Sequence, residues 1–289
     1  MNIQEHIILA PYTVFKIGGP AHYFFEAKNR EEIREAVAWA CKQSMPLFVL
    51  GAGSNVLVSD EGFDGLVLKI NARNVRVEGD MLIADAGASM GQAVSVAMQR
   101  GLGGLEWAIG IPGTVGGSVF GNAGCFGAET KDAIAAVDVL QYPEMLCLKN
   151  SDCDFSYRTS AFKRHPEWII LGAVYKLSAQ DPEDIKRLIA EYSKKRTVTQ
   201  DIGSKCAGCI FKNAIDPNSG SLISAGYLID TAGMKGVSVG GAMVSPKHAN
   251  FIINTGGATA HDVKQLILMI KEKIRSHHGI ELHEEMRYL

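Results

Sequence analysis

The feature that most constrains this chain is a glycine-dense run from Gly110 to Gly124, in which six residues are glycine. Glycine lets the backbone turn sharply and approach a ligand at positions where a side chain would block the contact. Within the run, Pro112 fixes a turn and Asn122 stands among small residues. We interpret the run as a loop that lies against a flat or charged ligand. Glycine needed only for tight packing is the alternative.

A second glycine loop precedes this run, where Gly51 and Gly53 follow a short apolar segment. The spacing suggests the dinucleotide fingerprint of Rossmann folds, but Val56 occupies the third glycine position and the following residues predict strand and turn rather than helix. Successive backbone N–H groups in such a turn can still bind an anion, with Ser54 and Asn55 as added donors. A plain β-turn is the alternative. Together, the two loops suit a long ligand such as a dinucleotide held from two sides.

The order of the predicted elements indicates an α+β fold. Apolar residues at helical spacing, together with capping residues, predict helices over 31–43, 89–100, 181–192 and 259–278. Short apolar or alternating runs predict strands at 46–50, 66–70, 75–84, 137–141 and 168–177. These elements do not alternate strictly, as they would in a doubly wound sheet. The glycine loops precede Asp181, whereas a charged helix and a polar segment follow it. This change in composition predicts two domains, residues 1–182 and 183–289.

Charge and hydropathy exclude several partner classes. The net charge is -2, so no basic field indicates a nucleic-acid partner. No segment approaches the roughly 18 apolar residues of a membrane-spanning helix. Residues 1–10 lack the basic start and the cleavage pattern of a signal peptide. We therefore expect a cytoplasmic protein that binds neither nucleic acid nor membrane.

Two groups of residues resemble metal or redox sites. Cys206 and Cys209 form a Cys-x-x-Cys pair, which is typical of a redox dithiol or of half a zinc site. Zinc needs further ligands, and Cys147 and Cys153 do not have the usual spacing. Three histidines near residue 280 are typical of a helix C-terminus, where a positive charge is favoured. We expect no metal, while a regulatory disulfide between Cys206 and Cys209 stays an alternative.

The glycine-rich run from Gly104 to Gly127 resembles the FAD-binding signature of the UDP-N-acetylenolpyruvoylglucosamine reductase family. The resemblance continues along nearly the whole chain in six ordered motifs: Thr13–Ala21, Leu50–Asp60, Tyr157–Lys163, Ala207–Asn213, Leu228–Asn254 and Leu282–Tyr288. It implies an FAD-binding PCMH-type domain (the vanillyl-alcohol-oxidase-like fold) made of two α/β subdomains. A C-terminal α+β substrate-binding domain follows, and its last residues return to the flavin site. The spacing of Arg158 and Cys209 resembles the short type II branch, which lacks an insertion carrying a substrate-binding tyrosine.

The resemblance implies a reaction in peptidoglycan precursor synthesis. NADPH reduces non-covalently bound FAD and leaves, and UDP-N-acetylglucosamine enolpyruvate then takes its place. Hydride passes from flavin N5 to the terminal carbon of the enolpyruvyl group, the adjacent carbon receives a proton, and UDP-N-acetylmuramate results. The family implies a monomer whose partners are NADPH and the UDP-sugar.

The same resemblance implies a role for each site residue. Arg158 and Glu285 stabilise the enolic intermediate, and Cys209 donates the proton where most members of the family have serine. The predicted substrate contacts are Lys212, Asn213 and Arg287. The predicted FAD contacts are Gly51, Ala52, Gly53, Ser54, Asn55, Pro112, Gly113, Thr114, Gly116, Gly117, Asn122 and Ala123.

Two other functions remain as alternatives. One is a different flavin-dependent oxidoreductase of the same fold, acting on a small alcohol or lactone. The other is a flavin- or nucleotide-binding protein that has lost its chemistry through the serine-to-cysteine change. NADPH as electron donor tests the first alternative, and turnover of the enolpyruvyl substrate tests the second.

Overall fold

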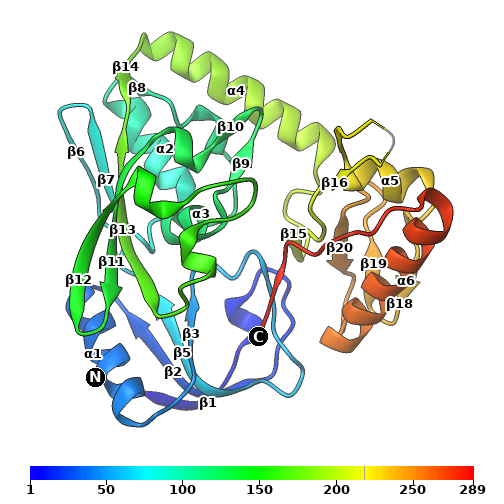
Figure 1. Cartoon of the computed structure of the whole chain (residues 1–289), viewed down its shortest axis with the longest axis horizontal. Coiled ribbons are helices and arrows are strands. Elements are labelled where there is room, and N and C mark those ends of the chain that lie inside the picture. The colour runs from blue at the N-terminus through cyan, green and yellow to red at the C-terminus, as the bar shows by residue number, and fades with distance from the viewer. Residues whose placement is uncertain (218) are drawn as a thin grey trace. The chain divides into compact units, whose positions relative to one another are not determined.

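A computed structural model describes residues 1–217 and 219–289 of the chain (Figure 1). These residues form two compact units. Unit 1 comprises residues 1–5, 23–52 and 65–196, and unit 2 comprises residues 6–22, 53–64 and 197–289. Helix and strand are mixed in both units, which confirms the predicted α+β class. Among the residues described, no helix combines the length and the apolar character needed to cross a bilayer.

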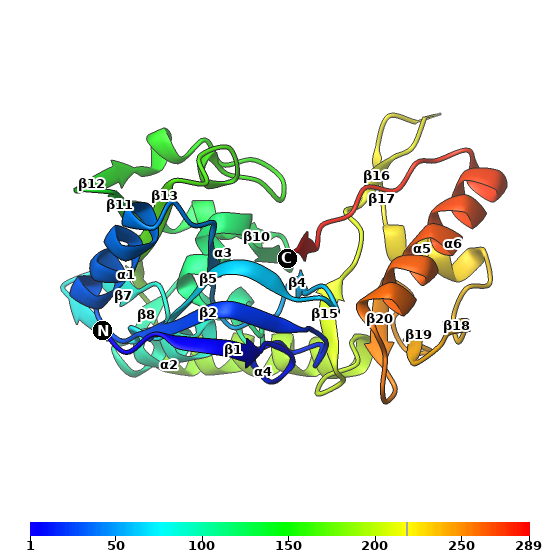
Figure 2. The ribbon, with the colours of Figure 1, turned by 90° about the horizontal axis from the view of Figure 1, so that it is seen from below.

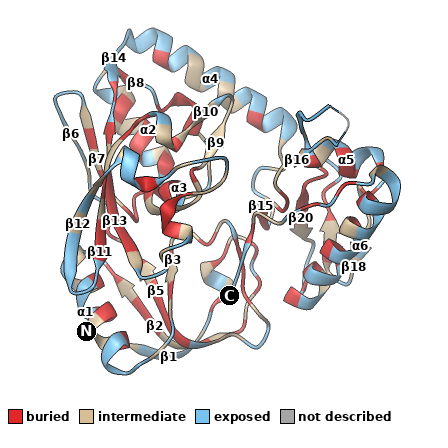
Figure 3. Ribbon diagram, in the orientation of Figure 1, coloured by how far each residue is buried: buried red, intermediate tan, exposed pale blue. Residues whose placement is uncertain are grey.

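The main sheet of unit 1 has five strands in the order β12-β11-β13-β7-β6, and every neighbouring pair is antiparallel. Its strands are β6 (Val75–Glu78), β7 (Met81–Asp85), β11 (Ile134–Gln141), β12 (Glu144–Lys149) and β13 (Trp168–Lys176). The single strand predicted at 75–84 is therefore a hairpin that turns at Gly79, which has φ 63°. In Figure 3 the central strand β13 is coloured mainly as buried, which places the core against this sheet.

A second sheet has the order β1-β2-β5-β3. Its strands are β1 (Gln4–Ile8), β2 (Pro20–Ala27), β3 (Leu47–Leu50) and β5 (Phe63–Ile70), and β3 runs parallel to β5. Helix α1 (Arg30–Lys42) connects β2 to β3. It begins because the Asn29 side chain accepts a hydrogen bond from Glu32 N, and its apolar face buries Ile33, Ala36, Val37 and Ala40. Strand β3 ends at Leu50, and the first glycine loop begins directly after it at Gly51.

Helices α2 (Met90–Gln99) and α3 (Val115–Gly121) belong to unit 1. Ser89 caps α2 as predicted, by accepting a hydrogen bond from Gln92 N. Helix α3 is not predicted by the sequence, because its glycines give no helical periodicity. Thr114 starts α3 by accepting a hydrogen bond from Gly117 N, and Val115 and Val119 are fully buried. The second glycine loop is thus partly helical rather than a series of turns.

The remaining strands of unit 1 are β8 (Leu102–Gly103), β9 (Gly124–Cys125), β10 (Ala128–Glu129) and β14 (Ser178–Ala179).

Helix α4 (Pro182–Thr199) crosses the boundary between the compact units, which lies at Arg196–Thr197. Most of α4 belongs to unit 1 because Ile185 is buried and lies with Ile189 against the apolar residues around α2. Near its end, the buried Arg196 guanidinium lies 5.5 Å from the centre of the Phe126 ring. The functional division into residues 1–182 and 183–289 stays a prediction.

Unit 2 is built around a four-stranded sheet with the order β15-β20-β19-β18. Its strands are β15 (Cys206–Cys209), β18 (Ser238–Val239), β19 (Ala242–Val244) and β20 (Phe251–Asn254). Helix α6 (Ala260–His278) packs on β18 and β19, and α5 (Ala225–Thr231) packs on α6 (Figure 2). Thr259 and Asp262 form the predicted capping box of α6. Two short pairs complete the unit, β16 (Ala214–Ile215) with β17 (Leu222–Ile223) and β4 (Val56–Leu57) with β21 (Arg287–Tyr288).

Candidate active site

A cavity of about 400 Å³ in unit 1 brings the two predicted glycine loops to one place. Ala52 comes from the first loop, and Gly110, Ile111, Pro112, Gly113 and Thr114 come from the second. The other lining residues are Lys69, Ile70, Arg73, Gly87, Ser89, Gly91 and Gln92. The prediction that both loops contact the same ligand therefore has a physical basis in one unit.

The loops touch because Gly51 has no side chain. A Cβ atom at this position would lie 2.7 Å from Oγ1 of Thr114, which is closer than real Cβ contacts come. Thr114 is itself held by a backbone bridge to Ser89, and Met90 N donates a hydrogen bond of 3.1 Å to Gly113 O. Gly116 also lies against its neighbours, since a Cβ there would be 2.9 Å from Cβ of Ala86. Close packing thus explains these two glycines at least as directly as ligand contact does.

The charges that line the cavity are positive. The Lys69 ammonium donates a hydrogen bond to Gly51 O, and Arg73 lines the same cavity. Burial lowers the pKa of Lys69 below its ordinary value, although the nearby Glu26 carboxylate opposes this effect. The first turn of α2 adds its own positive potential, because Gly91 and Gln92 are at the N-terminal end of the helix. An anionic group is favoured here.

These residues fit FAD. Its pyrophosphate needs cations, helix N-termini or backbone amides, and its flat rings need backbone without side chains, as the cavity provides. Ala52 is the residue of the first loop that lines the cavity, and its N–H group donates no backbone hydrogen bond within residues 1–217 and 219–289. Gly53, Ser54 and Asn55 belong to unit 2.

The first loop also has a second role. Gly53 has φ 66°, and a Cβ there would clash with the carbonyl oxygen of Tyr12, so only glycine is accommodated. Asn55 binds the C-terminal segment within unit 2. Its Nδ2 lies 3.4 Å from Glu285 O, and its carbonyl oxygen accepts a hydrogen bond of 3.1 Å from Arg287 N. Asn55 therefore joins the predicted cofactor loop to the segment with the predicted acid.

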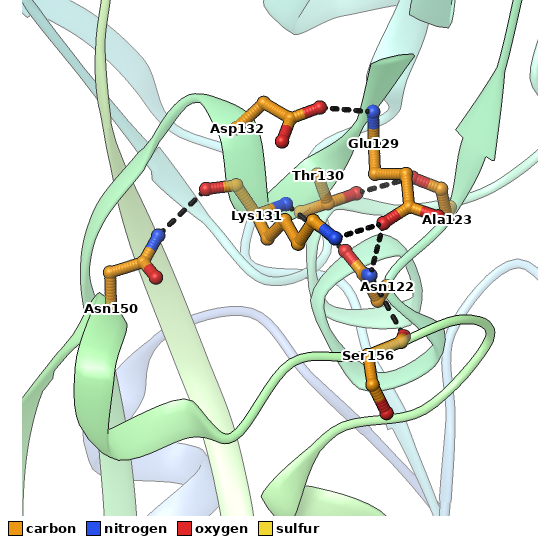
Figure 4. Close-up of polar contacts among 8 residues, drawn as sticks. All are labelled: Asn122, Ala123, Glu129, Thr130, Lys131, Asp132, Asn150 and Ser156. Atoms are coloured by element: carbon orange, nitrogen blue, oxygen red, sulfur yellow. Dashed lines mark hydrogen bonds and ion pairs between the residues drawn. The ribbon is translucent and has the colours of Figure 1, made fainter. Parts of the chain in front are cut away.

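The Asn122 side chain is fully buried and hydrogen-bonded in unit 1. Its exposed fraction is 0%, and Figure 4 shows its amide bonded to Glu129 and Ser156. Nδ2 donates to Glu129 Oε2 at 2.9 Å and to the Ser156 carbonyl at 3.0 Å, while Oδ1 accepts from Lys131 N at 3.0 Å. Both amide hydrogens are used. These hydrogen bonds show that Asn122 supports the loop, and its contact with FAD stays a prediction.

The neighbours of Asn122 continue this network. The Ala123 carbonyl accepts hydrogen bonds from Thr130 N at 2.8 Å and from Thr130 Oγ1 at 2.9 Å. Cys125 follows in the same loop, half-buried and reduced, and pairs with Ala128 across the β9–β10 hairpin. Neither Ala123 nor Cys125 is among the described residues that line the cavity.

Arg158 occupies a strained turn of unit 1. Its φ is 54°, a left-handed conformation that is uncommon outside glycine. Ser156 and Thr159 close the turn with two backbone hydrogen bonds of 3.1 and 3.0 Å. The Arg158 carbonyl accepts a hydrogen bond of 2.7 Å from Lys163 Nζ. Strain held in place by such contacts is common at functional sites, so the backbone is consistent with the predicted role of Arg158.

In unit 2, the segment with Cys209 lies beside the segment with Glu285. Glu285 N donates a hydrogen bond of 2.8 Å to Ile210 O, and Lys212 N donates one of 2.9 Å to His283 O. Phe211 and Glu284 form an antiparallel bridge between these two bonds. Cys209 and Glu285 are both half-buried. The structure thus brings the predicted proton donor and the predicted acid onto adjacent backbone segments, whereas Arg158 belongs to the other unit.

The two adjacent glutamates have different environments. Glu284 is held by hydrogen bonds from the Lys271 ammonium and from the Tyr288 hydroxyl. Burial alone would raise the pKa of Glu284, but these two donors and the Lys271 charge outweigh it and lower the pKa. The Glu284 carboxylate is therefore bound by Lys271 and Tyr288, and the role of Glu285 as the functional acid stays a prediction.

The predicted substrate contacts have separate local roles. Asn213 Oδ1 accepts a hydrogen bond of 3.2 Å from Ala225 N, the first residue of α5. The Arg287 side chain is exposed on β21, and Lys212 is half-buried. All three belong to unit 2, the same unit as Cys209.

Sequence reasoning missed several residues that the structure places in these sites. Lys69 and Arg73 line the cavity, together with Ser89 and Gln92 at the start of α2. Lys69 in the otherwise apolar run 66–70 was the available signal, because a lysine is rarely buried in a strand unless its charge is paired. Asn250 holds the loop after Cys209, and no local pattern marks it.

Two family models and several relatives match this chain. Residues 21–144 match the model of an FAD binding domain, and residues 200–289 match the model of the UDP-N-acetylenolpyruvoylglucosamine reductase C-terminal domain. The chain is 42% identical to the UDP-N-acetylenolpyruvoylglucosamine reductase of Caldanaerobacter subterraneus subsp. tengcongensis, over 96% of this chain and 90% of the relative. It is 40% identical to the enzyme of the same name from Protochlamydia amoebophila, over 99% and 93%. The crystal structure of UDP-N-acetylenolpyruvylglucosamine reductase from Thermus caldophilus superposes with a TM-score of 0.84 at 35% identity, covering 100% of this chain and 99% of that one.

Proposed function

The chain belongs to the UDP-N-acetylenolpyruvoylglucosamine reductase family, and we propose that it reduces UDP-N-acetylglucosamine enolpyruvate to UDP-N-acetylmuramate for peptidoglycan synthesis. It is an FAD oxidoreductase that takes its electrons from NADPH. FAD bound without a covalent link would carry hydride between NADPH and the substrate. The cavity lined by both glycine loops, with Lys69 and Arg73 as counter-charges, is the place that would hold it.

Cys209 would supply the proton that completes the reduction. When hydride adds to the terminal carbon of the enolpyruvyl group, the adjacent carbon and its carboxylate gain negative charge. A new C–H bond at the adjacent carbon then forms as the S–H bond of Cys209 breaks, which leaves a thiolate that water reprotonates. General-acid catalysis of this kind contributes about 10²- to 10⁴-fold in rate.

Arg158 and Glu285 would stabilise the charge that develops before this proton arrives. A guanidinium compensates an enolate directly, and a protonated carboxyl can donate a hydrogen bond to it. Lys212 and Arg287 suit the anionic groups of the UDP-sugar, and Asn213 suits its polar groups.

The observation that carries the proposal is the antiparallel pairing of residues 210–212 with residues 283–285. Cys209, Lys212 and Asn213 are on or next to one of these segments, and Glu285 and Arg287 on or next to the other, which supports their proposed roles at one site. An alcohol or lactone oxidoreductase of the same fold has no need of this constellation. The match of residues 200–289 to the reductase C-terminal domain likewise supports the reductase over that alternative.

We further propose that the enzyme is a cytoplasmic monomer that binds neither nucleic acid nor membrane. The net charge of -2 supports this, because nucleic acids and anionic membranes attract basic proteins.

Anaerobic spectroscopy tests the function in two steps. NADPH should bleach the oxidised flavin spectrum of the purified protein. Addition of UDP-N-acetylglucosamine enolpyruvate should then restore the spectrum and yield UDP-N-acetylmuramate. A flavin that NADPH does not bleach would favour the alcohol or lactone oxidoreductase. A bleached flavin that the enolpyruvyl substrate does not reoxidise would show that the substrate assignment is wrong.

A further inference from the structure

The loop that follows Cys209 is held by one buried side chain, that of Asn250. Its Oδ1 accepts a hydrogen bond of 2.9 Å from Phe211 N, and its Nδ2 donates one of 2.8 Å to Phe211 O. The Asn250 backbone adds a third bond, because its carbonyl accepts from Ile210 N at 2.9 Å. Asn250 is only 3% exposed. Three hydrogen bonds thus connect one residue to the two positions directly after the proposed proton donor.

The sheet alone does not fix this loop. Strand β15 pairs with β20 through Cys206 and Ile253 and through Cys209 and Phe251, with an irregularity between the two pairs. Gly208, with φ 74°, lies in that irregular stretch. The strand pairing ends at Cys209, and the amide of Asn250 continues it by imitating the donor and acceptor of a further strand residue.

On the side away from Asn250, Ile210 and Phe211 bind the C-terminal segment. Ile210 O accepts the hydrogen bond from Glu285 N, and Phe211 bridges to Glu284. Ile210 and Phe211 therefore lie between Asn250 on one side and the segment with Glu285 on the other. A shift of these residues would move the proton donor and the acid together.

We infer that Asn250 is a positioning residue for the protonation step: it sets the location of Cys209 and, through Ile210 and Phe211, that of Glu285. The inference rests on the proposed function. Asn250 touches neither cofactor nor substrate in this role. Its effect should therefore be confined to the half-reaction in which the substrate is protonated, since the cavity that fits FAD belongs to unit 1.

Asn250→Asp is the sharpest variant, because it keeps the shape and replaces the Nδ2 donor by an oxygen that repels the Phe211 carbonyl. Asn254→Asp is its matched control. Asn254 is the last residue of β20, the strand that begins directly after Asn250. Its side chain is similarly engaged, donating to Phe15 O at 3.0 Å and accepting from Gly256 N at 3.0 Å, but it does not bond the loop after Cys209. Asn250→Ser, which carries no buried charge, replaces the aspartate variant if that one does not fold with FAD.

Stopped-flow traces of the FAD-loaded proteins should separate the two half-reactions. For Asn250→Asp we expect flavin reduction by NADPH at the parent rate. Reoxidation by UDP-N-acetylglucosamine enolpyruvate should slow by about 10²-fold, the cost of misplacing a reacting group by about 1 Å. The solvent deuterium isotope effect on reoxidation should increase, because protonation becomes limiting. Asn254→Asp should match the parent in both half-reactions.

Three results would overturn the inference: equal slowing of both half-reactions, unchanged reoxidation in Asn250→Asp and Asn250→Ser, or the same loss in Asn254→Asp. Failure of the proposed function has a different signature. In that case the parent protein itself would be reduced by NADPH but not reoxidised by the enolpyruvyl substrate.

Discussion

Gly51 and Thr114 lie so close that a single added carbon on Gly51 would sit 2.7 Å from the Thr114 hydroxyl oxygen. The two residues are in different glycine loops and both belong to unit 1. Their contact places Ala52 on the same cavity as Gly113 and Thr114. The cavity that fits FAD thus depends on a close approach of two backbone segments, and this dependence can be tested.

Gly51→Ala should weaken FAD binding by about 10- to 100-fold, because overpacking of this kind costs about 1–3 kcal/mol. Flavin fluorescence on titration of the apoprotein measures the dissociation constant. Gly121→Ala is the matched control, since nothing lies within 4 Å of a Cβ at that helical position. It should bind FAD normally and gain slightly in stability. Equal affinity of the Gly51→Ala protein and the parent would contradict the close contact.

Lys69→Met should weaken FAD binding by about 10- to 100-fold, because a hydrogen bond to a charged group is worth about 1.5–3 kcal/mol. The pKa of Lys69 is lowered by burial in the free protein, and bound pyrophosphate would raise it again. FAD affinity of the parent should therefore be full at neutral pH and should fall as alkaline pH passes the lowered pKa. Isothermal titration over this pH range, with the exposed Lys42→Met as control, checks the prediction. An alkaline decline of the same size in Lys69→Met would assign it to another group.

Glu285→Gln and Arg158→Ala should leave flavin reduction by NADPH intact and slow reoxidation by the enolpyruvyl substrate. Each residue is assigned to charge that develops only in the second half-reaction, where loss of one stabilising group costs roughly 10²- to 10³-fold in rate. Stopped-flow spectroscopy resolves the two steps. Glu284→Gln, one residue away, should keep both rates. Slowing of both half-reactions by the same factor would indicate a collapsed site.

Glu284→Gln should instead reduce stability at neutral pH, by about 0.5–1 kcal/mol for a partly exposed pair. The pKa of Glu284 is lower in the folded protein than in the unfolded chain, as a result of Lys271 and Tyr288. Its contribution is therefore full at neutral pH and is lost as the pH falls through the folded-state pKa. Urea unfolding at neutral and at acidic pH should show the difference from the parent shrinking in acid. A difference independent of pH would point to lost packing.

Cys209→Ser should retain substantial turnover, because it restores the residue that is usual in the family. Cys209→Ala should keep flavin reduction but lose turnover by about 10²- to 10⁴-fold, the range for general-acid catalysis. Peroxide pretreatment should inactivate the parent and spare the serine variant. Turnover of the alanine variant at the parent rate would show that another group or a water molecule donates the proton.

Local signals predicted those parts of the fold that local forces determine. Ser89 and Thr259 cap helices as their sequence context indicates, and the failed third glycine position near Val56 correctly predicted a strand there. The α+β class of the fold and the two glycine loops followed from such signals. Helix α3 was missed because its start depends on Thr114 and on burial of two valines, rather than on periodicity.

Residues whose hydrogen-bond partners are distant in the sequence could not be placed from local patterns. Asn250 bonds a residue 39 positions away, and nothing in its neighbourhood marks that pairing. Asn122 stands among small residues, as a ligand contact would, but Glu129, Lys131 and Ser156 consume its hydrogen-bonding groups. Position in a motif thus predicts that a residue matters, whereas the pairing in space decides whether it contacts ligand or supports the loop.

The three separate segments of unit 2 have a consequence for how the chain folds. Its core contains Phe15, Ile17 and Leu57 together with residues from Ala207 to Met286. The Asp60 carboxylate accepts hydrogen bonds of 2.8 and 3.0 Å from Ala260 N and His261 N at the start of α6. Contacts across some 200 residues require long loops to close first, which slows folding. A fragment of residues 183–289 would lack three core side chains, so we expect it to aggregate or remain partly unfolded instead of forming an independent substrate-binding module.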